Sequence, residues 1–338
     1  MKKNQIKKVR TCGKLYVGGE YAVLFEGQSA IIKNINIFMY GEIFFSSEYK
    51  IKSDMFDYSV NLESDKNYSL IQETIIAMNE YLLKKGQKIQ PFHLEITGKM
   101  EKNGKKYGIG SSGSVVVLTV KAINELYNLN LTKDMLFKLA TYVLLKRGDN
   151  GSMGDIACIS YENLIIFCGF DKNKIREDIK KMDMLDVLNE NWGYKIEEIN
   201  CNINCEFLVA WTKEPSISSE MIKKVKAKID KNFLEKTEKN VLELKKAFEN
   251  GDKSQIIENI KNIGSLLYKL DKDIYNEKIK NIVESQIDLE IIAKSSGAGG
   301  GDCGIAISFN ENHTKIIEKR WSERDIEVLY KEKMRSNN

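Results

Sequence analysis

A glycine- and serine-rich segment, Gly108–Ser114, runs directly into an apolar helical pattern and leaves few folds open to this chain. Val115, Leu118, Ala122 and Leu126 recur on one face of the helix that follows. Glycines let the backbone approach a ligand closely, and the first N–H groups of a helix have no intrahelical partner. The segment therefore predicts a loop that opens a helix N-terminus, a geometry that suits a polyphosphate.

The hydroxyls of this loop add to that prediction. Ser111, Ser112 and Ser114 can bond phosphate oxygens or complete a magnesium shell beside the positive end of the helix dipole. The segment is not the Walker pattern, which needs a lysine followed by Ser or Thr after the second glycine. It is not the Rossmann glycine pattern either. Taken alone, the same composition is also compatible with a surface connection.

Two further segments each carry one charged residue at a structurally defined place. Lys14 lies in a strand, Gly13–Val17, that ends in the glycine turn Gly18-Gly19. Asp155 stands at the head of a short apolar helix after the turn Asn150-Gly151-Ser152. In isolation, the lysine could be a solvated side chain and the acid a helix-start residue favoured by the dipole.

A fourth segment, Lys294–Gly304, places a run of small residues between two strands. Such a run makes a poor hairpin unless a ligand needs the space, although a mobile hairpin is the alternative.

Patterns along the first half of the chain alternate between strand and helix. Strands are predicted at 6–17, 29–48, 92–96 and 164–167 from their β-branched, aromatic or alternating residues. Helices are predicted around 71–82, over 132–146 with Thr132 as N-cap, and after the turn at 150–152.

From about residue 200 the pattern changes. A strand at 207–211 precedes three amphipathic helical patterns, one of them carrying Ile222, Val225, Ile229 and Phe233. Strands at 291–293 and 303–308 flank the glycine run, and a helix near 311–322 precedes a last strand near 326–330. We expect a domain boundary near 195.

Composition excludes several classes of protein. The formal net charge is only +4, with 52 basic and 48 acidic residues, so no nucleic-acid partner is expected. No apolar run approaches the roughly 20 residues that span a bilayer, and no signal peptide is recognisable, which predicts a cytoplasmic protein without a membrane partner. The six cysteines form no CxxC pair, so we expect reduced packing residues.

Together and in this order, the four segments closely resemble the ordered motifs of the GHMP kinases: a lysine strand, a phosphate loop, a catalytic acid and a C-terminal glycine loop. Within that superfamily the resemblance is to the phosphomevalonate kinases. It rests on Gly13–Tyr16 with Gly19–Val23, on Tyr107–Ser114, on Trp211-Thr212 with Glu214–Ser216, and on Ser296–Gly304. The chain departs from the family at Gly18 and Lys213, where members commonly carry another small residue and glycine.

The resemblance covers about residues 10–322 and is weakest at 50–65 and 170–200. It implies an α+β fold of two domains. Residues 1–195 would form a ribosomal-protein-like ATP-binding domain with a left-handed crossover, and residues 196–338 a ferredoxin-like domain. The two substrates would meet in the cleft between them.

The resemblance also implies site residues. Gly108, Gly110, Ser111, Ser112, Gly113 and Ser114 would wrap the phosphates of ATP, with Ser112 on Mg²⁺. Asp155 would orient or accept the proton of the acceptor phosphate, and Lys14 would stabilise charge on both reacting groups. Candidate donors to the acceptor are Lys14, Arg147, Ser152, Ser218, Ser219, Ser296, Gly297, Ala298 and Gly299.

The implied reaction is transfer of the γ-phosphoryl group of ATP to the phosphate of phosphomevalonate in isoprenoid biosynthesis. Mevalonate kinase or another small-molecule kinase of the same superfamily is the nearest alternative, and a non-catalytic ATP-binding relative is the second. Both a monomer and a homodimer are compatible with the sequence.

Overall fold

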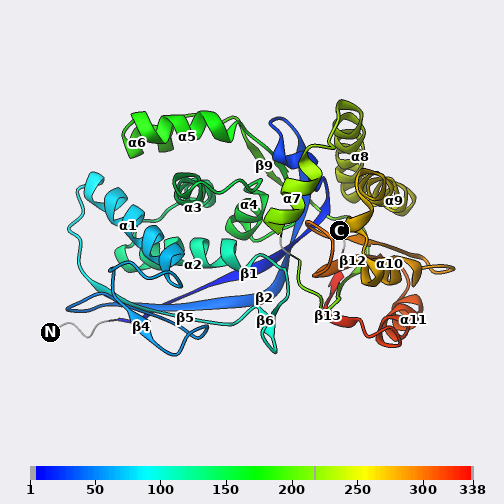
Figure 1. Ribbon diagram of the computed structural model, residues 1–338, viewed down its shortest axis with the longest axis horizontal. Helices are drawn as coiled ribbons and strands as arrows, with labels where there is room; N and C mark the ends of the chain where they lie inside the picture. The colour runs from blue at the N-terminus through cyan, green and yellow to red at the C-terminus, as the bar shows by residue number, and fades with distance from the viewer. Residues whose placement is uncertain (1–4, 217, 336–338) are drawn as a thin grey trace.

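The computed structural model describes residues 5–216 and 218–335, with residues 218 and 219 described by their backbone only. The strands form two main sheets, and helices pack on each of them (Figure 1). The α+β fold predicted from the sequence is confirmed.

The first sheet has the order β4-β3-β5-β2-β8-β9, with β1 paired to β2. Its neighbours are antiparallel except β3 and β5, which are parallel and are connected through helix α1. The strands are β1 (Lys7–Gly18), β2 (Ser29–Phe45), β3 (Lys50–Ser53), β4 (Ser59–Val60), β5 (Phe92–Thr97), β8 (Ile165–Cys168) and β9 (Lys195–Glu198).

The helices of the first part lie together on one side of this sheet (Figure 1). Residues at their ends explain their bounds: Thr132 caps α3 by accepting a hydrogen bond from the Met135 N–H, and the left-handed Gly148 ends it. These helices are α1 (Ser69–Lys84), α2 (Ser111–Tyr127), α3 (Lys133–Arg147), α4 (Gly154–Tyr161), α5 (Lys172–Lys181) and α6 (Met184–Asn189). A short hairpin, β6 (Glu101–Lys102) and β7 (Lys105–Lys106), precedes the glycine-serine loop, and a 3-10 turn, η1 (Ala22–Leu24), follows β1.

The second sheet is antiparallel throughout, in the order β11-β12-β10-β13. It consists of β10 (Cys205–Trp211), β11 (Ile291–Ser295), β12 (Cys303–Ser308) and β13 (Glu327–Met334). The helices of this part are α7 (Ser218–Lys226), α8 (Lys231–Asn250), α9 (Lys253–Leu270), α10 (Glu277–Glu284) and α11 (Glu311–Ser322), with a 3-10 turn η2 (Lys272–Ile274).

The largest difference from the sequence prediction concerns the pattern from Ile222 to Phe233. It forms two helices rather than one, because the Asp230 carboxylate accepts a hydrogen bond from the Phe233 N–H and starts α8. The segments in which the resemblance was weakest also contain regular structure, namely β3, β4, α5, α6 and β9.

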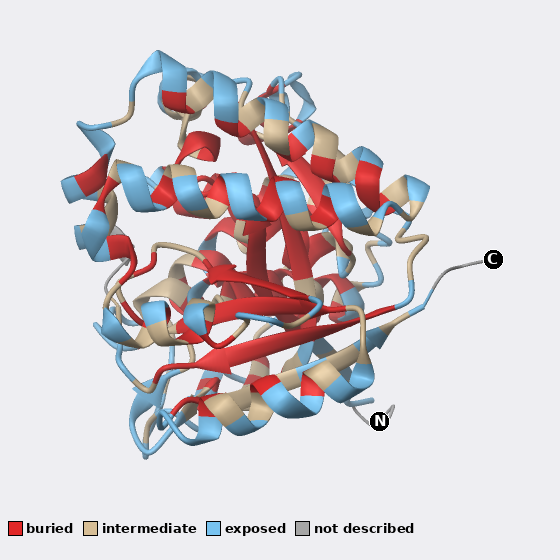
Figure 2. Ribbon diagram, turned by 90° about the vertical axis from the view of Figure 1, so that its right-hand side faces the viewer, coloured by how far each residue is buried: buried red, intermediate tan, exposed pale blue. Residues whose placement is uncertain are grey.

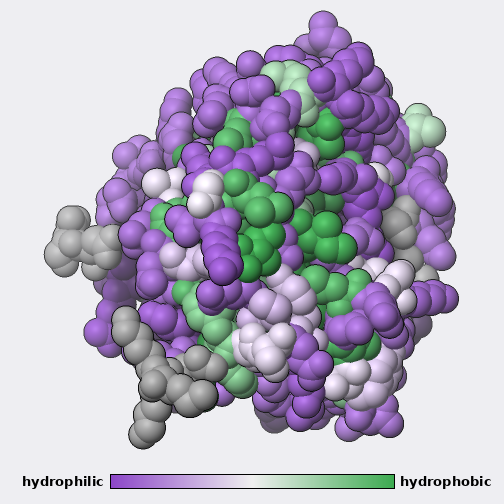
Figure 3. All heavy atoms as spheres, turned by 90° about the vertical axis from the view of Figure 1, so that its left-hand side faces the viewer, coloured by the Kyte–Doolittle hydropathy of each residue, from purple (hydrophilic) through white to green (hydrophobic). Residues whose placement is uncertain are grey.

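Burial follows the layers. Figure 2 shows helices with exposed outer faces over strands that are buried along most of their length. The opposite end of the molecule is mostly hydrophilic, with hydrophobic side chains gathered near the centre of the view (Figure 3). Within the described ranges the six cysteines are free, as predicted, and no helix is long and apolar enough to cross a bilayer.

Candidate functional site

A cavity of about 170 Å³ lies where the two sheets meet and gathers residues from all four predicted segments. We call it the acceptor cavity, after the role that is proposed for it below. Its lining comes from β1, the turn after β1, the segment Gly108–Ser114 (called the phosphate loop), the start of α4, helix α7 and the loop between β11 and β12. The lining residues are Lys14, Tyr16, Glu20, Tyr21, Val23, Leu24, Gly108, Gly151, Ser152, Asp155, Ile222, Ser296, Gly297, Ala298 and Asp302.

Lys14 is held at this cavity by its strand and by the phosphate loop. Its backbone N–H donates to the Ile109 carbonyl at 2.9 Å, which joins the loop to β1. A Cβ at Gly110 would stand 2.8 Å from the Lys14 Cε. A larger residue here would have to displace the end of the lysine side chain, and the left-handed φ of 90° at Gly110 favours glycine.

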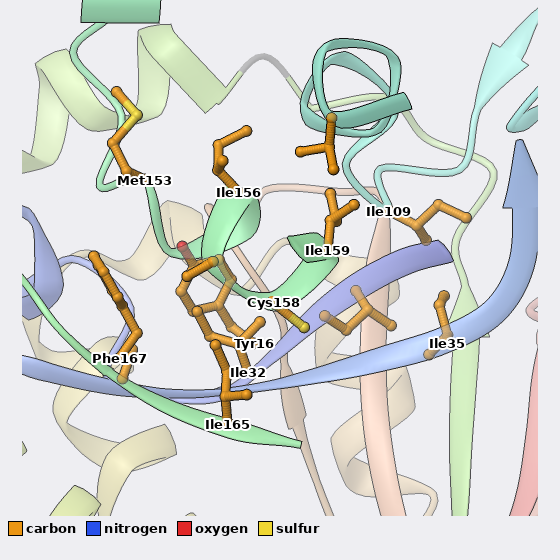
Figure 4. Packing of buried hydrophobic residues seen from close by; sticks show 14 of the residues in the cluster. Tyr16, Ile32, Ile35, Ile109, Met153, Ile156, Cys158, Ile159, Ile165 and Phe167 are labelled. Atoms are coloured by element: carbon orange, nitrogen blue, oxygen red, sulfur yellow. The ribbon is translucent and has the colours of Figure 1, made fainter. Parts of the chain in front are cut away.

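Asp155 lies in the first turn of α4, and it is half-buried at the lining of the acceptor cavity. Burial raises the pKa of this carboxyl, and the positive charge of Lys14 opposes the shift. Ile156 and Ile159 anchor the helix in the core, together with Ile32, Ile165 and Phe167 (Figure 4). The charged end of α4 is thus fixed by the apolar packing of the rest of the helix.

The phosphate loop leaves the N-terminus of α2 open. Gly110 occupies the N-cap in a left-handed conformation, and no side chain caps the helix. The first N–H groups of α2 therefore point out of the helix without a side-chain acceptor, and they carry the positive end of its dipole. Ser112 is exposed and Ser111 half-buried at this end.

Ser114 corrects the sequence prediction for this loop. It is fully buried, and its hydroxyl donates to the Cys12 carbonyl at 2.9 Å while its N–H donates to the Gly110 carbonyl. The side chain of Ser114 therefore fastens α2 to β1 and is not free for a phosphate. Serine spacing alone cannot separate these roles, since the helix turns Ser114 inward and Ser112 outward.

A second cavity, of about 180 Å³, is lined in part by Ser111 and Ser112. We call it the nucleotide cavity, after the role that is proposed for it below. Lys106 and Val115 line it near the loop, and residues that the sequence did not single out line the rest: Met39, Ser53, Asp54, Met55, Phe56, Asn67, Leu70, Ile71, Ile96, Gly98, Lys99, Met100 and Glu101. No sequence signal marks Ser53–Phe56, because this stretch lies in the part where the resemblance is weakest.

The loop after β11 is fastened to the end of β1. The Ser296 hydroxyl donates to the Tyr16 carbonyl at 2.8 Å, and the Tyr21 hydroxyl donates to the Ala298 carbonyl at 2.5 Å. Gly299, in contrast, is outside the acceptor cavity lining, and its carbonyl accepts from the Ser216 hydroxyl at 2.6 Å. Ser296–Ala298 are therefore brought to the cavity, while Gly299 supports the loop.

Ser152 reaches the cavity but is already engaged. Its hydroxyl lies 2.8 Å from the Tyr16 hydroxyl and accepts from the Gly154 N–H at 3.1 Å. Tyr16 is buried, and burial raises the pKa of its hydroxyl. The pair therefore forms a neutral wall of the acceptor cavity.

Arg147 is not brought to the acceptor cavity. Its guanidinium pairs with Glu73 at 2.6 Å and donates to the Ser69 hydroxyl at 3.1 Å, on the outer side of α1 and α3. The predicted donors Ser218 and Ser219 begin α7, but their side chains lie outside the described residues.

Asp302 is a cavity residue that sequence reasoning missed. A Cβ at Gly108 would stand 2.4 Å from its Cγ, so the carboxyl lies against the start of the phosphate loop. One carboxylate oxygen accepts from the Ser216 N–H at 3.2 Å, and burial raises the pKa of the group. Its place inside a glycine run was a visible signal, since it is the only acid there.

Comparisons with known proteins agree with this geometry. The family model for the GHMP kinases N terminal domain matches residues 69–163, and the model for the GHMP kinases C terminal domain matches residues 244–326.

Individual relatives refine the comparison. A phosphomevalonate kinase of Streptomyces sp. is 25% identical, over 91% of this chain and 92% of the relative. A mevalonate kinase of Methanocaldococcus jannaschii is 27% identical, over 95% and 97%. The solved Streptococcus pneumoniae phosphomevalonate kinase, in complex with phosphomevalonate and AMPPNP, is 49% identical, with a TM-score of 0.96 over 97% of this chain and 100% of that chain. The chain therefore belongs to the GHMP kinase family and, within it, to the phosphomevalonate kinases.

Proposed function

We propose that this enzyme transfers the γ-phosphoryl group of ATP to the phosphate of (R)-5-phosphomevalonate, giving 5-diphosphomevalonate and ADP. The observation that carries the proposal is the shared acceptor cavity of Lys14 and Asp155, next to the open N-terminus of α2. The pneumococcal relative, with phosphomevalonate and a nucleotide analogue bound, supports the same pair of substrates.

The phosphates of ATP would lie on the N–H groups that open α2, where the helix dipole favours negative charge. The base and ribose would then extend into the nucleotide cavity, past Ser111 toward Ser53–Phe56. Its apolar walls and its direct continuation from the loop support this assignment.

The residues at the loop fit a magnesium ion. The exposed Ser112 hydroxyl is an oxygen donor at the place where the phosphates would lie, and Mg²⁺ is bound through few protein oxygens together with phosphates and water. No group of three or more acidic, histidine or cysteine side chains within the described ranges could hold a metal by itself. When bound, the ion would supply charge neutralisation to the phosphates.

The reaction needs positioning and charge neutralisation more than covalent help from the protein. The bond from the γ-phosphorus to the β–γ bridging oxygen breaks, a bond to an oxygen of the acceptor phosphate forms, and ADP leaves. Lys14 would neutralise charge on both phosphates across the cavity. Asp155 would orient the acceptor phosphate, which needs little deprotonation at neutral pH because its second pKa is near 6.

Acceptor contacts would come from the loop Ser296–Ala298 and from the start of α7 at Ser218 and Ser219. The first segment lines the acceptor cavity, and Ile222 of α7 lines it as well.

ADP release should be measured separately with phosphomevalonate, mevalonate and diphosphomevalonate as acceptors. We expect turnover with phosphomevalonate only. Turnover with mevalonate alone would replace the proposed acceptor by that of the mevalonate kinases, to which the chain is also related. Nucleotide binding without turnover of any of the three would indicate a non-catalytic relative.

A further inference from the structure

A buried ion pair joins the two parts of the molecule at the edge of the acceptor cavity. The Lys294 ammonium contacts the Glu20 carboxylate, and their side chains are only 1% and 2% exposed. Glu20 follows β1 of the first sheet and Lys294 belongs to β11 of the second sheet. No other pair of oppositely charged side chains in the described ranges is buried this completely on both sides.

The glycine turn after β1 brings Glu20 to this place. A Cβ at Gly18 would stand 2.7 Å from the Ile263 side chain of α9. A Cβ at Gly19 would stand 2.3 Å from the Ser29 carbonyl, and its φ of 92° is left-handed. Glycine is therefore required at position 19 by the close approach to the β2 backbone, whereas a larger residue at position 18 would have to displace the Ile263 side chain.

The residues that follow each member of the pair fasten the loop after β11. Next to Glu20, the Tyr21 hydroxyl donates to the Ala298 carbonyl. Two residues after Lys294, Ser296 donates to the carbonyl of Tyr16. Lys294 itself also donates to the Ser295 carbonyl at 2.6 Å. The ion pair is therefore the charged member of a set of contacts between the end of β1 and the loop Ser296–Ala298.

Stability alone gives little reason for such a pair. Removing two charges from water is costly, and an apolar pair of similar volume is often equally or more stable. Burial correspondingly lowers the pKa of Lys294, and Glu20 opposes that shift. What a salt bridge adds over an apolar contact is a defined geometry between its two ends.

We propose that Glu20 and Lys294 form a positioning pair that sets the loop Ser296–Ala298 at the correct distance from Lys14 on β1. The proposal rests on the function proposed above, since this loop is assigned to the acceptor. It predicts that loss of the pair weakens use of the acceptor and leaves nucleotide binding unchanged, because the N-terminus of α2 does not depend on these residues.

A second ion pair offers a matched control. Lys33 of β2 contacts Glu332 of β13 at 2.9 Å, so it also joins the two sheets, and its side chain is 7% exposed. Neither residue lines the acceptor cavity. Lys33→Met therefore removes a buried charge between the two sheets without changing a residue of the loop Ser296–Ala298 or of the acceptor cavity lining.

The main test compares the wild-type enzyme with the neutral double variant Glu20→Gln/Lys294→Met and with Lys33→Met. The readouts are the thermal midpoint, the Kd for AMPPNP, kcat and KM for phosphomevalonate, and hydrogen exchange of peptides covering Ser296–Gly301. We expect the double variant to keep its AMPPNP affinity, to lose about 10- to 100-fold in kcat/KM for the acceptor, and to exchange faster in the loop. Lys33→Met should change only the thermal midpoint.

Two outcomes would overturn the proposal: a folded double variant with wild-type acceptor kinetics and loop exchange, or an equal acceptor defect in Lys33→Met. If the double variant does not fold, Glu20→Asp replaces it, since this change keeps the charge and shortens the side chain. Unchanged acceptor KM and loop exchange in Glu20→Asp would then contradict the proposal. Failure of the wild type to use phosphomevalonate would instead refute the proposed function, and loop exchange would still test the pair.

Discussion

Gly113 in the first turn of α2 lies directly against the carboxylate of Asp155 in the first turn of α4. A Cβ at position 113 would stand 3.1 Å from the Asp155 Oδ2 and 3.0 Å from the Ile156 Cδ1. The N-termini of α2 and α4 thus approach each other closely at a position where glycine leaves room for the Asp155 carboxylate.

Gly113→Ala should therefore lower kcat without unfolding the protein. The added methyl requires a shift of a few tenths of an ångström between α2 and Asp155, and misplacement on that scale is expected to cost about tenfold in rate. Steady-state kinetics with both substrates checks this. The double variant with Asp155→Asn serves as control, because two changes at one contact should not be additive. Additive losses would show that Gly113 acts elsewhere.

Lys14→Ala should reduce kcat more than Asp155→Asn does. No second cation among the lining residues of the acceptor cavity can replace Lys14, whereas the acceptor phosphate is already largely ionised at neutral pH. Single-turnover rates at pH 7 with saturating substrates measure both losses. A larger loss for Asp155→Asn would mean that proton removal, and not charge neutralisation, limits the step.

Asp155→Asn should raise the stability of the folded protein at neutral pH. The folded-state pKa of Asp155 is above its ordinary value of 3.8, so the folded protein binds this proton more tightly than the unfolded chain. Any stability that comes from the protonated group is present below pH 3.8 and is lost as the pH rises through the folded-state pKa. Thermal unfolding at pH 7 measures the gain, and a lower midpoint for the variant would contradict the sign.

Ser114→Ala should affect the stability of the protein, whereas Ser112→Ala should affect its Mg²⁺ requirement. Ser114→Ala removes a buried hydrogen bond to Cys12 and should lower the free energy of unfolding by about 1 kcal/mol, with little change in Mg²⁺ requirement. Ser112→Ala removes an exposed hydroxyl, so stability should hold while the Mg²⁺ concentration for half-maximal activity rises. Denaturant titration and Mg²⁺ titration separate the two. An increased KM for ATP in Ser114→Ala would restore its predicted phosphate role.

Many helices and strands and much of the acceptor cavity could be predicted from local sequence patterns, whereas the α+β fold was predicted from the resemblance to the GHMP kinases. The glycine loop before an apolar helix, the lysine strand and the acid at the head of α4 each depend on neighbouring residues in the chain. Thr132 was recognisable as a cap for the same reason, since a cap and its helix are only three residues apart.

The orientation of single side chains was decided only by tertiary packing. Ser112 and Ser114 are the same residue type two positions apart, and only the packing of α2 on β1 turns one outward and buries the other. The orientation of the Arg147 side chain depends on its ion pair with Glu73 of a different helix. Glu20 pairs with Lys294, which lies near the other end of the sequence. Local propensity and spacing act over a few residues, whereas these contacts exist only after distant segments have packed, which is why the sequence alone could not assign them.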